Sequence, residues 1–208
     1  MTRRNIIVNN QITPNKIPEI RFYDFLNYSQ LSHQEKLLNS LVNCYQHVFE
    51  ESWQEHYSKS HILKKLKNEI RGYACLRIIE DTNTSEVIGF CWAQHQSSAE
   101  TISSINTIEY IRNQTKLPLE NIIEDHKHAV YIHDLGIKNG FRHSIPLQLI
   151  IPPVIECVAT LSDCRDILFW SIGNTCISHI ANKISLSKYH QHGDIQFFRG
   201  ALPMIYSK

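Results

Sequence analysis

Apolar and polar positions follow two different periods along this chain, and each change of period marks a structural element. Residues 1–16 are polar and without a period, which predicts a loose N-terminal arm. Ile17–Phe25 is predicted to be a strand. Ser32 and Glu35 then fit a capping box before a helix. The helical stripe consists of Leu37, Leu38, Leu41, Val42, Tyr45, Val48 and Phe49.

The next stretch predicts a second helix and a hairpin. Ser60–Arg71 has apolar residues at helical spacing and stops at Gly72. Its lysines Lys64, Lys65 and Lys67 are expected to form the solvated face. Two strands follow, Tyr73–Glu80 and Glu86–Gln94, joined by a short polar turn that indicates an antiparallel pair.

The second half of the chain predicts one parallel crossover. A polar insertion over residues 97–125, with one short helix, leads into the strand Ala129–Ile137. An apolar helix is expected from about Ser144 to Leu161, kinked or broken at Pro152-Pro153. Ile167–Ile172 is the next strand, which completes a βαβ unit.

The C-terminal region completes the sheet. A helix is expected after Asn174, followed by strands at Ile195–Arg199 and Leu202–Tyr206. The order of elements predicts an α/β (α+β) fold. Its central sheet is mixed and mostly antiparallel, with a single βαβ crossover and flanking helices. We expect one domain over residues 17–206.

Composition and charge give no support to several classes of partner. The 208 residues contain 21 Lys plus Arg and 20 Asp plus Glu, a net charge of +1, which gives no reason to expect a nucleic acid or an anionic membrane. No apolar run approaches the roughly 18 residues of a membrane-spanning helix. The N-terminus lacks the apolar segment of a secretory signal, so a cytoplasmic protein is expected.

Cysteine and histidine are the candidates for metal binding. The six cysteines are scattered through apolar runs without a CxxC pair, which favours buried free thiols over disulfides or a metal site. Of the twelve histidines, His126 with His128, or His190 with His192, would be the candidate ligands. No Cys or carboxylate accompanies them at ligand spacing, so we expect no metal.

The run Ala129–Arg142 carries the most distinctive chemistry. An apolar strand ends at an Asn139-Gly140 turn, and Arg142 then precedes the helix expected from Ser144. A strand that passes through a polar loop into a helix N-terminus can hold a phosphate, because the first-turn N–H groups are unpaired and the helix dipole is positive there. The alternative is that these residues only cap the helix.

With these elements the chain resembles the Gcn5-related N-acetyltransferase (GNAT) family. Three stretches carry the resemblance: CYQHVFEESW at 44–53, EVIGFCWAQ at 86–94, and DLGIKNGFRHSIPLQLI at 134–150. The third is followed by the expected helix NTCISHIANKISL at 174–186. The family loop reads Q/R-x-x-G-x-G/A. Arg142 matches its first position, whereas Ile145 and Leu147 stand at the two small-residue positions.

The resemblance implies acetyl-CoA, or another acyl-CoA, as co-substrate. The main chain of the turn around Ile145 and Leu147 would bind the pyrophosphate, with Arg142, His143 and Ser144 adding charge or hydrogen bonds. The main chain of Leu135, Gly136 and Ile137 would pair with the pantetheine arm. Asn174 is either a helix N-cap or a contact to that arm.

The resemblance also implies an acyl transfer that needs a base and an acid. On the fourth strand His133 would be the base and Asp134 would orient the substrate ammonium; the alternative is a structural pair. Strand alternation places the two on opposite faces. Many members of the family use a Tyr of the last helix as the general acid, and the corresponding position here is Ala181. Tyr189, just beyond that helix, would take this role if the chain folds back. Trp53 and His56 either form an acceptor lid or only pack in a loop.

The function expected from this is acyl-CoA-dependent N-acyltransfer, most simply acetylation of a primary amine. Two alternatives stay open: a degenerate GNAT-fold binding module, and an enzyme with a longer acyl donor. The acceptor would be a small molecule or a protein amine. The architecture is also compatible with a homodimer that pairs through an exposed final strand.

Overall fold

The computed structural model describes residues 19–108, 111, 117–123, 127–173, 181 and 186–202. Seven strands form one sheet in the order β1-β2-β3-β4-β5-β7-β6. The predicted arm, Asn174 and most of the helix expected after it lie outside the described residues. The strands are β1 (Ile20–Phe25), β2 (Ala74–Asp81), β3 (Glu86–Ser97), β4 (His128–Ile137), β5 (Asp166–Ile172), β6 (Ser187–His192) and β7 (Ile195–Ala201).

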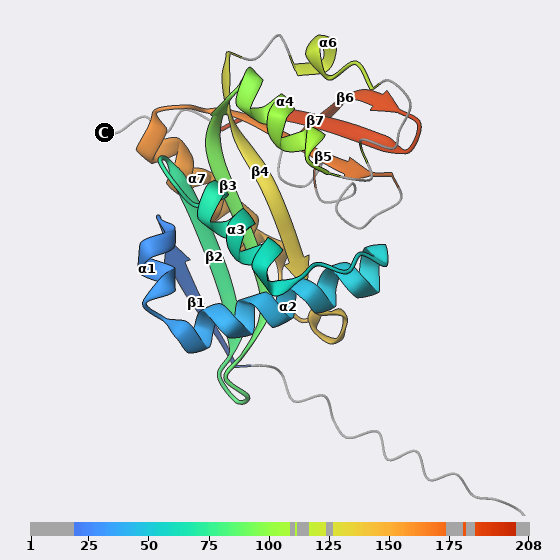
Figure 1. The fold of residues 1–208 in the computed structure, drawn as a ribbon. Coiled ribbons are helices and arrows are strands. Elements are labelled where there is room, and N and C mark those ends of the chain that lie inside the picture. Colours follow the sequence, from blue (N-terminus) through green and yellow to red (C-terminus); the bar gives the residue numbers. More distant parts are fainter. Residues whose placement is uncertain are drawn as a thin grey trace, which may run out of the picture.

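Helices cover both faces of the sheet (Figure 1). They are α1 (Tyr28–Ser32), α2 (Glu35–Trp53), α3 (Lys59–Glu69), α4 (Ser98–Asn106), α6 (Leu119–Ile123) and α7 (Ile151–Ser162), with 3₁₀ turns η1 (Asn139–Phe141) and η2 (Leu147–Leu149). One core lies between the sheet and α7, and two others lie on the opposite face, under α1–α3 and under α4 with α6. None of the described helices is long and apolar enough to cross a membrane.

The mixed, mostly antiparallel sheet with one crossover confirms the predicted fold class. Neighbouring strands pair antiparallel except β4 and β5, which are joined through α7 and run parallel. Several boundaries differ from the prediction. The last hairpin is made by β6 and β7, so Ser187–His192 is a strand that the sequence pattern did not indicate. Its residues are polar and mostly exposed, as an edge strand tolerates.

The predicted capping box at Ser32 and Glu35 is wrong. Ser32 ends the short helix α1, and α2 begins at Glu35 after Gln34, which makes no side-chain cap. The box forms instead at α4, where the Ser97 hydroxyl accepts from the Glu100 N–H and the Glu100 carboxylate accepts from the Ser97 N–H. A Ser-x-x-Glu spacing forms this motif only where the Ser has an extended backbone and the helix begins at the next residue, as at Ser97.

The predicted helix from Ser144 is also wrong in its start. Residues 139–149 form the turns η1 and η2, and α7 begins only at Ile151. Pro152 and Pro153 therefore do not kink the helix; they occupy its second and third positions. Proline is tolerated in a first helical turn because the N–H that it lacks has no partner there.

Candidate active site

A cleft of about 780 Å³ opens where β4 and β5 separate. The two strands pair only at Val130–Ile167 and Tyr131–Leu168. Beyond these pairs β4 runs toward α2 while β5 turns away (Figure 1). The second half of β4 therefore has no described strand partner on its β5 side. The cleft is walled by α2, the α2–α3 loop and α3 on one side and by Phe169, Trp170 and Ser171 of β5 on the other.

A β-bulge at His133 shapes the floor of this cleft. Trp92 of β3 pairs with Asp134 and the next residue, Ala93, pairs with Ile132, so His133 is an extra residue in β4. The bulge changes which residues share a face of the sheet. The His133 ring packs edge-on against Tyr131, and Asp134 on the same face meets α2 and α3. The expectation that His133 and Asp134 lie on opposite faces is thus wrong, since both line the cleft.

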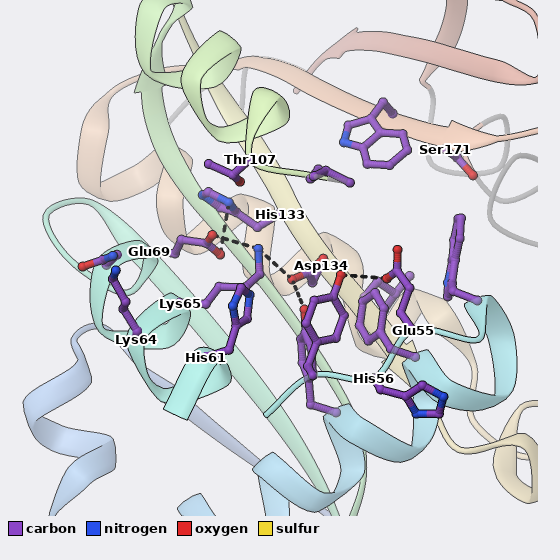
Figure 2. A pocket seen from close by; sticks show the side chains of 18 of the residues that line it. Glu55, His56, His61, Lys64, Lys65, Glu69, Thr107, His133, Asp134 and Ser171 are labelled. Atoms are coloured by element: carbon purple, nitrogen blue, oxygen red, sulfur yellow. Dashed lines mark hydrogen bonds and ion pairs between the residues drawn. The ribbon is translucent and has the colours of Figure 1, made fainter. Parts of the chain in front are cut away.

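Lys65 and Glu69, one turn apart on α3, meet these two residues (Figure 2). The Lys65 Nζ lies 2.8 Å from Glu69 Oε1 and 3.3 Å from Asp134 Oδ2. The three side chains are only 14–18% exposed. The expectation that Lys65 belongs to the solvated face is therefore wrong, although Lys64 beside it is exposed.

Glu69 is held from three sides. Besides Lys65 on Oε1, its Oε2 accepts the Trp92 indole N–H at 2.8 Å and lies 3.3 Å from His133 Nδ1. The other ring nitrogen of His133, Nε2, lies 3.3 Å from the Gln96 amide nitrogen. Nε2 also lies 3.3 Å from Gln94 Oε1, which itself accepts from the Gln96 amide nitrogen at 3.2 Å. In a neutral imidazole whose Nδ1–H donates to Glu69, Nε2 is an acceptor and takes its hydrogen bond from Gln96.

Burial and the nearby Lys65 cation lower the pKa of His133 to about 3. The imidazole is therefore neutral at physiological pH. With both ring nitrogens engaged, His133 supports Glu69 and is a poor proton acceptor for a ligand in the cleft.

Asp134 has one carboxylate oxygen, Oδ1, that accepts no hydrogen bond from the described residues. Its Oδ2 accepts from the Tyr45 hydroxyl at 3.1 Å and from Lys65. Burial raises the pKa of Asp134, against the opposing effect of Lys65. For Lys65, burial favours the neutral amine, but Asp134 and Glu69 outweigh it and raise the pKa, so the side chain stays an ammonium.

Aromatic rings of α2 and of the α2–α3 loop line the cleft beside Asp134. The Tyr45 ring stacks on Phe49 at 4.4 Å between centroids and meets Tyr57 edge-on at 5.7 Å. The Tyr57 hydroxyl donates to Glu55 at 2.7 Å. Trp53 and His56, for which an acceptor lid and loop packing were both open, line the cleft at the end of α2 and in the following loop.

The turn after β4 does not look like a phosphate site. Arg142 reaches back, its Nε donating to the Ile137 carbonyl and its Nη2 to Ser52 of α2. Ile145 is 2% exposed and belongs to the core under α7. Leu147 packs against the same core, and His143 and Ser144 are exposed.

The other predicted residues are spread around the site. Leu135 lines the cleft, Gly136 faces α2 and Phe90, and Ile137 lies in the α7 core. Tyr189 lies in β6, where its hydroxyl donates to the Ile122 carbonyl, and it does not line the cleft.

Candidate metal and thiol residues show no ligand cluster in the described part of the chain. No three His, Cys, Asp or Glu side chains gather there as a metal ion would need. Five of the six cysteines are described, and all five are free thiols. Three of these, Cys44, Cys75 and Cys91, are buried.

Sequence reasoning missed Lys65, Glu69 and Tyr45. The available signal was weak: Lys65 and Glu69 stand at the i, i+4 spacing of a helical ion pair, a spacing common on solvated faces. Tyr45 belonged to the predicted apolar stripe, and only its hydroxyl distinguishes it from a core residue.

Comparison with solved structures finds acetyltransferases that share this fold. Arabidopsis thaliana NAA60 in complex with acetyl-CoA superposes with a TM-score of 0.56 at 19% identity, over 88% of this chain and 98% of that one. The mosquito protein arylalkylamine N-acetyltransferase like 5b gives a TM-score of 0.57 at 11% identity, over 88% of this chain and 100% of that one. The PaiA N-acetyltransferase of Thermoplasma acidophilum with coenzyme A gives 0.56 at 10%, over 88% and 99%. No protein-family model matches the sequence, and no curated protein matches it significantly.

Proposed function

We propose that this protein, whose fold is that of the GNAT N-acetyltransferases, transfers an acyl group from a thioester donor of the acyl-CoA type to a primary amine. One observation carries the proposal: the gap between β4 and β5 opens directly beside Asp134, a buried carboxylate whose Oδ1 receives no hydrogen bond from the residues that the structure describes. Structural neighbours crystallised with acetyl-CoA or coenzyme A support the choice of donor.

The charges of the site suit an ammonium acceptor. Glu69 and Asp134 carry two negative charges against the single positive charge of Lys65, and His133 is neutral. The cluster therefore has a net charge of −1 and attracts a protonated amine. Asp134 Oδ1 is the atom to which that ammonium would donate.

The reaction assigns separate roles to these groups. The donor supplies an activated carbonyl. Asp134 takes one proton from the bound ammonium, and the free amine then forms the C–N bond at the thioester carbonyl. As the C–S bond breaks, the nitrogen loses a second proton and the leaving thiolate takes one up, so the products are an amide and a thiol. Glu69, with His133 and Trp92 behind it, holds Lys65, which in turn positions the Asp134 carboxylate.

The test is thiol release by the full chain with acetyl-CoA and a panel of amino acids, polyamines, lysine peptides and peptides with free N-termini, each product identified by mass. Asp134→Asn should lower kcat/KM at least 100-fold, since general acid–base catalysis contributes roughly 10²–10⁴. Asp166→Asn, at the far end of β5, is the matched control and should change it less than twofold. Equal activity of the two variants would contradict the proposal.

A second candidate is a binding module of the same fold without catalysis. It is favoured by the turn after β4, where Arg142 is turned toward α2 and Ile145 is buried. The same assay separates the two, because a binding module would release no thiol with any amine.

A further inference from the structure

We propose that the donor is recognised as an acyl-pantetheine thioester and that the turn between β4 and α7 makes no contact with a diphosphate. This inference rests on the proposed function and specifies its donor. It rests on the main-chain N–H groups and the charged side chains of residues 138–151, all of which the structure describes.

The first turn of α7 cannot offer the N–H groups that hold a phosphate. Four N–H groups at the start of a helix, those of the N-cap and of the first three residues, have no partner inside the helix. The N-cap of α7 is Ile150, and its N–H donates to the Leu147 carbonyl. The other three belong to the first turn. Here the second and third belong to Pro152 and Pro153, which have none. The remaining one belongs to Ile151, which is 3% exposed and follows the fully buried Ile150.

Many main-chain N–H groups of the loop before α7 already donate to carbonyl groups of the protein. The N–H of Lys138 donates to Ile88, and those of residues 141, 142, 144, 149 and 150 donate within the loop itself. A further position, Pro146, has no N–H. The Ile145 side chain fills the core beneath the turn.

The two permanent cations of the loop are also engaged. The Lys138 Nζ lies 3.1 Å from the Glu86 carboxylate. The Arg142 guanidinium donates to Ser52 and to the Ile137 carbonyl. A diphosphate would have to displace both sets of contacts to gain a charge-assisted bond.

The cleft itself ends before the loop. Its β4 lining consists of His133, Asp134 and Leu135, and no residue of 138–151 lines it. Beyond Tyr131 no described strand pairs with this edge of β4, so its main-chain groups can bind an amide-containing arm as they would bind an added strand. The recognised part of the donor is therefore the acyl group with its pantetheine arm.

The test compares acetyl-CoA, acetyl-pantetheine and acetyl-N-acetylcysteamine as donors to the same amine. We expect kcat/KM values for the first two within fivefold of each other, and a drop of tenfold or more for the third, which lacks most of the arm. A preference of 100-fold or more for acetyl-CoA over acetyl-pantetheine would overturn the inference while leaving the proposed function intact. Product from none of the three would overturn both.

A charge-reversal pair gives an independent readout. Gln148 is exposed in η2, just before α7. Gln148→Glu and Gln148→Lys should give the same dissociation constant for CoA, within twofold, by calorimetry at low salt. If a diphosphate bound at this turn, the Glu variant would bind CoA at least tenfold more weakly than the Lys variant, and that result would overturn the inference.

Discussion

Replacing Lys65 by Met removes the cation that lies between the two buried carboxylates of Glu69 and Asp134. Lys65 lies 2.8 Å from Glu69 and 3.3 Å from Asp134, and the three side chains are no more than 18% exposed. Breaking a buried pair by removing one partner costs 3–5 kcal/mol, whereas an exposed pair contributes roughly 0.2–1 kcal/mol. Allowing for the residual exposure, we expect Lys65→Met to lose about 3 kcal/mol of unfolding free energy.

The assay is urea unfolding at pH 7.5 followed by circular dichroism, with thermal unfolding beside it. For a domain of this size, about 3 kcal/mol corresponds to a Tm lower by roughly 6–12 °C. Lys64→Met is the matched control, because Lys64 is the exposed neighbour on the same helix, and it should change stability by less than about 0.5 kcal/mol.

The pH dependence checks the cause. Lys65 lowers the pKa of Asp134, although burial keeps that pKa raised overall. Without Lys65 the Asp134 pKa rises further, so the stability deficit is largest above that pKa and shrinks as acid protonates the carboxyl group. A deficit below about 1 kcal/mol, or one that grows on acidification, would refute the assignment of Lys65 to a buried ion cluster.

Three other changes test the structure at separate places. Gly136→Ala should cost about 1–3 kcal/mol, because its methyl carbon would lie 2.5 Å from an aromatic ring of β3, whereas Gly140→Ala, with open space around it, should be neutral; chemical denaturation compares them. Ser97→Ala should cost about 1 kcal/mol through loss of the α4 cap, and Ser32→Ala less than half of that. In NMR titration, the His133 ring should keep its neutral-form shift from pH 8 to pH 5. Because unfolded His protonates near 6.5, replacing His133 by Asn should reduce the loss of stability as pH falls from about 6.5 toward 3.

The sequence predicted the strands that form the centre of the sheet, because their apolar runs leave little choice. Ala129–Ile137 and Ile167–Ile172 match β4 and β5 to within a residue, and the apolar helix between them requires a parallel crossover. Helix starts were less predictable. Pro152-Pro153 is compatible with a broken helix or with the first turn of a helix. In the structure Ile150 and Ile151 are buried, and the two prolines stand in the first turn of α7.

The candidate site was only half predictable. His133 and Asp134 could be found from their place on the fourth strand, but their common face depends on a bulge that no local pattern announces. Lys65 and Glu69 come from a helix about 65 residues earlier, and their role exists only once α3 packs over β4. Long-range packing of this kind leaves no periodic trace in the sequence.

The short contact between β4 and β5 has a mechanical consequence. β1–β4 form one continuous ladder and β5–β7 another, and two residue pairs join them, at Val130 and Tyr131. The sheet therefore consists of two parts, β1–β4 and β5–β7, that are joined along a short contact. A change in the angle between these two parts would leave the hydrogen bonds within each part in place, and its cost would fall on the core under α7, which spans both.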